Sequence, residues 1–242
     1  VVDDVWADAL TWGELARLQC RERWRELRPA SAALDDHWSV LRLVDVLTLA
    51  REQSEQRGRA VGVAVEIKTG PLGARSDPSA LVEALLADLA ATGTPSGQVP
   101  VWLMAFDAAV LRELRRRQAT SAAAAACASV LLLEHRTPAG APGWRAAAAV
   151  CDLVGVEVGL LLESVGALAG EAVMAQARPP DLGVWTWTLR AENAFLPARL
   201  RRGPDAAGHG ALDVVVREAL DLGVQGLIGD QPALLRRLAC VV

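Results

Sequence analysis

The sequence has no tyrosine, only two phenylalanines and, apart from Lys68, no lysine. Its three histidines and four cysteines are scattered along the chain, and no two cysteines form a C-x-x-C pair. We therefore expect no zinc site, and we interpret the cysteines as buried free thiols rather than disulfides. Because the formal net charge is −4, the composition also argues against a nucleic-acid-binding surface.

Long hydrophobic runs are missing too. The longest, residues 122–133, is shorter than the roughly 20 residues that cross a bilayer, so we expect no transmembrane segment. The chain opens with the acidic segment Val1-Val2-Asp3-Asp4 rather than a signal peptide, and it lacks an initiator methionine, so we expect its natural start to lie upstream. Hydrophobic residues still make up 52% of the chain, which excludes disorder. The length of 242 residues is close to that of one α/β barrel.

From residue 61 onward, short β-rich runs alternate with amphipathic helical stretches. This alternation is typical of right-handed βαβ units and a parallel sheet. The predicted strands are Val61–Ile67, Val99–Met104, Ser129–Glu134, Asp152–Val158, Gly183–Thr188 and Gly223–Ile228. A closed barrel of this class needs eight strands. The predicted fold class is therefore α/β, an incomplete TIM-type (β/α)8 barrel whose first two strands are absent from this chain.

The first forty residues have a different composition from the rest. Residues 1–40 are polar and rich in tryptophan, so we expect an insertion segment that packs on the barrel. Residues 41–242 carry a helix over about Leu41–Gln56 and the six strand–helix units of a single barrel domain. Four aspartates are predicted to cap the helices that follow them, namely Asp77, Asp107, Asp205 and Asp230.

Candidate site residues follow from the strand ends, where barrel enzymes place their chemistry. Glu66 and Lys68 share one side of the first predicted strand, with Ile67 on the other. Such a pair suits a hard cation and a phosphoryl oxygen, but it equally suits a plain ion pair at a strand end. Trp185 and Trp187 also share a face, and either line a site or fill the barrel. The histidines His37, His135 and His209 lie in no motif and are interpreted as surface or structural.

Several segments, in order, resemble the glycerophosphodiester phosphodiesterase family. They are Val65-Glu66-Ile67-Lys68, Phe106-Asp107, Trp185-Thr186-Trp187-Thr188, Arg190-Ala191-Glu192-Asn193, Phe195-Leu196-Pro197 and Gly226-Leu227-Ile228-Gly229-Asp230-Gln231-Pro232. The segment Arg21-Glu22-Arg23-Trp24-Arg25-Glu26-Leu27-Arg28-Pro29 is similar to the insertion of that family's long-insert branch. The resemblance covers nearly the whole chain. Its final two motifs, the group from Trp185 to Pro197 and the run from Gly226 to Pro232, are specific when taken together.

The resemblance implies a distorted (β/α)8 barrel that hydrolyses glycerophosphodiesters, with a metal ion, to an alcohol and glycerol 3-phosphate. By this resemblance Glu66 matches a ligand of the divalent cation, Ca²⁺ or Mg²⁺, and Lys68 matches the lysine beside the substrate phosphate. Trp187 and Phe106 match aromatic residues that contact substrate. The implied partner is a small glycerophosphodiester. Proteins of the long-insert branch are often exported, so the resemblance favours a location outside the cytoplasm, but the sequence does not determine the compartment.

The chain departs from the family pattern at its beginning. The family opens with a strand ending in His-Arg-Gly and a second strand carrying Glu-x-Asp followed by a histidine, and no position here matches them. Because those histidines are the general base and acid, we predict no catalytic residue in this chain, no activity from it alone and no tight cation binding. The alternative is a degenerate, non-catalytic barrel that acts as a binding or interaction module. The strands flanking the missing pair would offer open edges for association.

Overall fold

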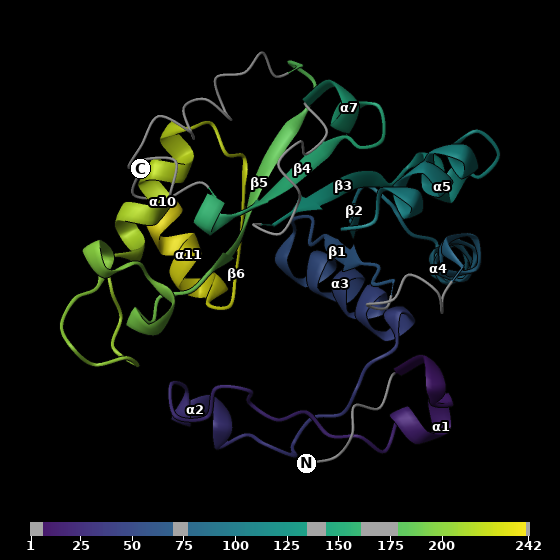
Figure 1. Cartoon of the computed structure of the whole chain (residues 1–242). Coiled ribbons are helices and arrows are strands. Elements are labelled where there is room, and N and C mark those ends of the chain that lie inside the picture. The colour runs from purple at the N-terminus through teal and green to yellow at the C-terminus, as the bar shows by residue number, and fades with distance from the viewer. Residues whose placement is uncertain (1–6, 70–76, 135–143, 161–178, 241–242) are drawn as a thin grey trace.

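The structure is a computed structural model that describes residues 7–69, 77–134, 144–160 and 179–240. Its centre is a curled sheet of six parallel strands in sequential order, which forms a half-barrel with helices outside it (Figure 1). The strands are β1 (Val63–Glu66), β2 (Val101–Ala105), β3 (Ala128–Leu133), β4 (Leu153–Glu157), β5 (Gly183–Leu189) and β6 (Gly226–Gly229). Within the described residues, β1 and β6 are the edges of the sheet.

All six predicted strands are confirmed, with bounds that move by a few residues. The largest change is at the last one, which begins at Gly226 rather than Gly223. Gly223 has a φ of 80°, in the left-handed region that ends helices rather than extends strands. The two edges are those predicted to flank a missing pair of strands, while association through them stays a prediction.

The helices cover the convex face of the sheet (Figure 1). They are α3 (Leu43–Arg57), α4 (Pro78–Thr92), α5 (Ala108–Gln118), α6 (Ala122–Ala125), α7 (Trp144–Ala148), α10 (Leu212–Asp221) and α11 (Pro232–Ala239). The main core lies between these helices and the strands, where Leu47, Leu89, Leu103, Leu111 and Leu114 are almost fully buried. No helix in the described ranges is both long and apolar enough to cross a bilayer.

Two of the four predicted caps are confirmed. Asp77 accepts a hydrogen bond from the first turn of α4, and Asp107 does the same for α5. The prediction for Asp205 is wrong, because α10 begins only at Leu212 and the Asp205 carboxylate bonds within its own turn. The prediction for Asp230 is also wrong, since α11 has no side-chain cap and the Asp230 carboxylate binds two arginines instead.

The concave face of the half-barrel is filled by alternate strand residues. Met104, Val130 and Leu132 are buried there, with Trp102 and Trp185 packed against them. The two indole rings lie 5.4 Å apart, centre to centre. Trp185 therefore fills the barrel, which was one of the two interpretations of the tryptophan pair.

The segment before α3 lies outside the hydrophobic core. It contains α1 (Trp12–Leu15) and α2 (Pro29–Ala32), and no described residue before Leu47 is buried. Figure 1 places both short helices away from the strands. The boundary at residue 40 stays a prediction, although these features are those expected of an insertion.

All four cysteines are free thiols, as predicted, but the prediction of burial is right for only two of them. Cys127 and Cys151 are buried free thiols, and burial raises the pKa of each to about 11. Cys20 and Cys240 are exposed, because they lie in the insertion and at the end of the last helix, where no core covers them.

Candidate functional site

The two charged residues of the first strand lie together at its carboxyl end. Glu66 pairs in register with Met104 and so faces the concave side. The Nζ atom of Lys68 lies 3.1 Å from Oε1 of Glu66. This Oε1 is shielded from solvent and has no hydrogen-bond partner, whereas the Lys68 side chain is 73% exposed. The structure thus contains the predicted ion pair and leaves its ammonium group open to a ligand.

The two aromatic residues expected to contact substrate also meet. Phe106 and Trp187 have ring centres 5.5 Å apart and ring planes at 89°, an edge-to-face contact. The indole Nε1 of Trp187 donates a 3.0 Å hydrogen bond to the carbonyl of Gly155, which fixes the ring. A Cβ atom at Gly155 would lie 2.7 Å from Cδ2 of Leu132, so a larger residue there would require the Leu132 side chain to shift. Phe106 remains 43% exposed and forms an open apolar wall.

One acidic residue escaped the sequence analysis. Glu157 is the last residue of β4, in register with Trp187 and two positions after Gly155. Alternation therefore places it on the concave side as well. The sequence could have identified Glu157, because it is a carboxylate near the end of a predicted strand, which is the reason Glu66 was singled out.

The described residues do not fit a tight cation site. A Ca²⁺ ion takes about six to eight oxygen ligands, yet in the described segments no three histidine, cysteine, aspartate or glutamate side chains gather closely enough to hold a metal. Glu66, with its unbonded Oε1, is the nearest to a ligand. A single carboxylate of this kind would hold such an ion only loosely.

Neither described histidine makes a hydrogen bond or ion pair with Glu66 or Lys68, or a ring contact with Phe106 or Trp187. His37 is exposed in the insertion, with Nδ1 2.9 Å from the carbonyl of Asp35. His209 is exposed too, and its backbone pairs in an isolated antiparallel bridge with Glu192, which follows β5. Both are surface histidines, as predicted. His135 lies outside the described residues.

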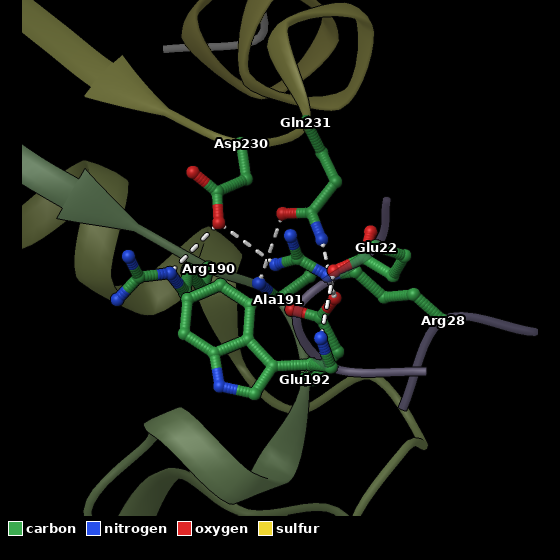
Figure 2. A network of polar contacts seen from close by, with 8 residues as sticks. Glu22, Arg28, Arg190, Ala191, Glu192, Asp230 and Gln231 are labelled. Atoms are coloured by element: carbon green, nitrogen blue, oxygen red, sulfur yellow. Dashed lines mark hydrogen bonds and ion pairs between the residues drawn. The ribbon is translucent and has the colours of Figure 1, made fainter. Parts of the chain in front are cut away.

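A polar cluster joins the insertion to the carboxyl ends of β5 and β6 (Figure 2). Arg28 donates from Nε to Glu192 at 2.5 Å and from Nη2 to Asp230 at 2.9 Å. Arg190 donates from Nε to the same Asp230 oxygen at 2.7 Å, and Gln231 donates to Glu192 at 2.8 Å. These five residues are called the Arg28 joint below.

Aromatic rings complete the joint. Trp24 and Phe195 pack edge to face with centres 4.9 Å apart, and the guanidinium groups of Arg28 and Arg190 lie 5.1 and 4.8 Å from the Trp24 ring centre. Burial raises the pKa of Glu192, but the hydrogen bonds from Arg28 and Gln231 outweigh it and hold that pKa below its ordinary value. In the sequence these residues stand out only as parts of the family motifs, and Asp230 alone among them has a predicted role, that of a cap.

A curled sheet of parallel strands, with helices outside and charged and aromatic side chains at the carboxyl ends, defines an α/β protein of the TIM-barrel class. A family model described as the glycerophosphoryl diester phosphodiesterase family matches residues 1–234. The chain belongs to this family, as the motifs suggested.

Solved structures agree on the fold. A crystal structure described as a glycerophosphoryl diester phosphodiesterase from Silicibacter pomeroyi DSS-3 superposes with a TM-score of 0.62 and 19% sequence identity. The match covers 96% of this chain and 68% of that one. A comparison with curated proteins found no match.

Proposed function

We propose that the carboxyl end of the half-barrel binds glycerophosphodiesters, with Lys68 beside the phosphate and Phe106 and Trp187 against the glycerol carbon chain. The observation that carries the proposal is the geometry of these three residues. An exposed ammonium group stands on the same face and at the same end of the sheet as an ordered aromatic pair. A phosphate oxygen and a short carbon chain match these two surfaces.

The full reaction, hydrolysis to an alcohol and glycerol 3-phosphate, is the activity we propose for the family's complete site. Proton transfer to the leaving alcohol needs a positioned acid, a contribution of about 10²–10⁴ in rate. In the described residues neither His37 nor His209 makes a hydrogen bond or ion pair with Glu66 or Lys68. We therefore expect these residues alone to bind the diester without turning it over, which agrees with the alternative of a non-catalytic binding module.

A divalent cation, Ca²⁺ or Mg²⁺, is proposed as a weak ligand only. Glu66 would supply one oxygen, and the ion pair with Lys68 competes for the same atom. Calorimetric titration of the chain with CaCl₂ should therefore give no binding tighter than the millimolar range. A micromolar dissociation constant that Glu66→Gln abolishes would contradict this.

The binding proposal is tested with sn-glycerol 3-phosphate, titrated calorimetrically at low ionic strength. Lys68→Met should weaken binding by about tenfold, the size of one charge-assisted hydrogen bond. Phe106→Ala should weaken it by a few fold. The control Arg51→Met alters an exposed side chain on α3 that donates to the carbonyl of Thr92, and should leave binding unchanged. Equal affinities for Lys68→Met and the unaltered chain would refute the site.

Turnover is measured on the same samples by release of glycerol 3-phosphate from glycerophosphocholine. We expect none above the uncatalysed rate, with or without added cation. Release that a chelator abolishes would show that the expected inactivity is wrong.

A further inference from the structure

Arg190 occupies a position that no role above explains. It directly follows β5, between Leu189 and Ala191, which are both buried in the cluster formed with α10 and α11. Since neighbouring residues of extended chain point to opposite sides, Arg190 projects away from those helices. That is the concave side, where Asp230 follows β6 and accepts the hydrogen bond from Arg190 Nε.

The two terminal nitrogens of Arg190 make no hydrogen bond to any described residue. Within the described residues, the bond from Nε to Asp230 is the one hydrogen bond that its side chain makes. Figure 2 shows both terminal nitrogens pointing away from Asp230 and Arg28. Because Arg28 already donates to the same Asp230 oxygen at 2.9 Å, that carboxylate has a cation without Arg190.

The guanidinium group of Arg190 is nevertheless held firmly. Its central carbon lies 4.8 Å from the ring centre of Trp24 and 4.9 Å from that of Phe195. The side chain is 27% exposed, so it is partly covered yet open to solvent. Two aromatic rings and one carboxylate therefore fix the orientation of a group whose two remaining donors, among the residues the structure describes, have no protein acceptor.

We propose that Arg190 is an oxyanion-binding residue that contacts the ligand of this site, a role that rests on the proposed function for the identity of the ligand. The two terminal nitrogens match the spacing of two phosphate or carboxylate oxygens. Prior fixation of the side chain lowers the entropy lost on binding. In TIM-type barrels the loops after the last two strands frequently form a phosphate site, and Arg190 follows the last strand but one.

The same arrangement implies selectivity for the alcohol part of the diester. A quaternary ammonium headgroup binds best against an aromatic face. At this joint the guanidinium groups of Arg28 and Arg190 already occupy the rings of Trp24 and Phe195. Arg190 therefore favours diesters that carry an additional anionic group over those that carry a cation.

The test measures binding of sn-glycerol 3-phosphate to the whole chain by calorimetry, so it does not depend on turnover. Arg190→Gln should weaken binding at least tenfold, and Arg190→Lys, which keeps the charge but loses the fork of donors, at least threefold. The matched control is Arg202→Gln, an exposed arginine of the same loop that pairs with Asp213, which should stay within twofold of the unaltered chain. If Arg190→Gln fails to fold by circular dichroism, Arg190→Lys decides.

Three results would overturn the proposal: no binding by the unaltered chain, Arg190 variants within twofold of it, or an equal loss in Arg202→Gln. A loss in Lys68→Met with Arg190→Gln unaffected would leave the proposed function standing and remove only the role of Arg190. Titrations with glycerophosphoserine and glycerophosphocholine then locate the contact. An effect of Arg190→Gln on the serine diester alone places it at the headgroup, and an equal effect on both places it at the phosphodiester.

Discussion

Replacing Arg28 should release the insertion from the half-barrel without unfolding the sheet. The Glu192 carboxylate is only 3% exposed and accepts from Arg28 at 2.5 Å. Removing one partner of such a pair costs about 3–5 kcal/mol because a charge is left buried. We expect about 3 kcal/mol for Arg28→Met, the lower end, since Gln231 still donates to Glu192 and Arg190 to Asp230.

Hydrogen exchange measures this loss directly. Neither α1 nor α2 contains a buried residue, so the insertion has little core of its own. The protected amides of residues 7–42 should therefore exchange about a hundredfold faster in Arg28→Met, because about 1.4 kcal/mol corresponds to a factor of ten. Amides in β2 and β3 should keep their protection.

The control and the double variant separate a specific joint from general damage. Arg21→Met breaks an exposed pair with Asp36 inside the insertion and should change stability little, because exposed ion pairs are screened by solvent. Combining Arg28→Met with Glu192→Gln should cost less than the sum of the two, with a coupling of about 1.5 kcal/mol or more. A coupling below about 0.5 kcal/mol, or less than a tenfold change in exchange, would refute the reasoning.

Three further outcomes are expected. The folded-state pKa of Glu192 lies below its ordinary value of 4.5, so the stability that this carboxylate contributes is fully present above pH 4.5 and is lost as the pH falls through the folded-state pKa. Urea unfolding between pH 7 and pH 3 should therefore show a smaller loss of unfolding free energy in Glu192→Gln than in the unaltered chain. An equal loss in the two proteins would contradict this. A thiol reagent at pH 8 should modify two cysteines of the native chain quickly, and Cys127 and Cys151 only on unfolding; four rapid reactions would disprove their burial. Trp187→Phe removes the hydrogen bond to Gly155 and should lower the free energy of unfolding by about 1 kcal/mol in urea titration. An unchanged value would mean that the bond contributes nothing.

Local sequence patterns predicted the sheet well because each strand carries its own signal. The run Ala128–Leu133 is apolar except for Ser129, as is typical of a strand buried on both faces. The pairing of Glu66 with Lys68 could also be predicted, since two residues separated by one share a side of a regular strand. The contact between Phe106 and Trp187 was not, because it joins two strands that are not neighbours in the sheet.

The contacts of the Arg28 joint could not be predicted from local sequence patterns either, because they join segments that are far apart in the chain. Arg28 and Glu192 are 164 positions apart, and no periodicity links the insertion to the loop after β5. The family resemblance named both segments, yet it gave no contact between them. Only the fold places the guanidinium group of Arg28 between Glu192, which follows β5, and Asp230, which follows β6.

Asp230 shows that a cap depends on position as well as on residue type. The capping residue stands directly before the helix, as Asp77 stands before Pro78, and such a cap is worth about 1 kcal/mol. At α11 that position belongs to Gln231, which makes no side-chain cap, so Asp230 lies one residue too early. Its carboxylate instead accepts hydrogen bonds from Arg28 and Arg190, and hydrogen bonds to charged partners are worth about 1.5–3 kcal/mol each. Caps predicted from an aspartate near a helix start should therefore hold where the aspartate immediately precedes the first helical residue, as at Asp77, and fail where another residue stands between them.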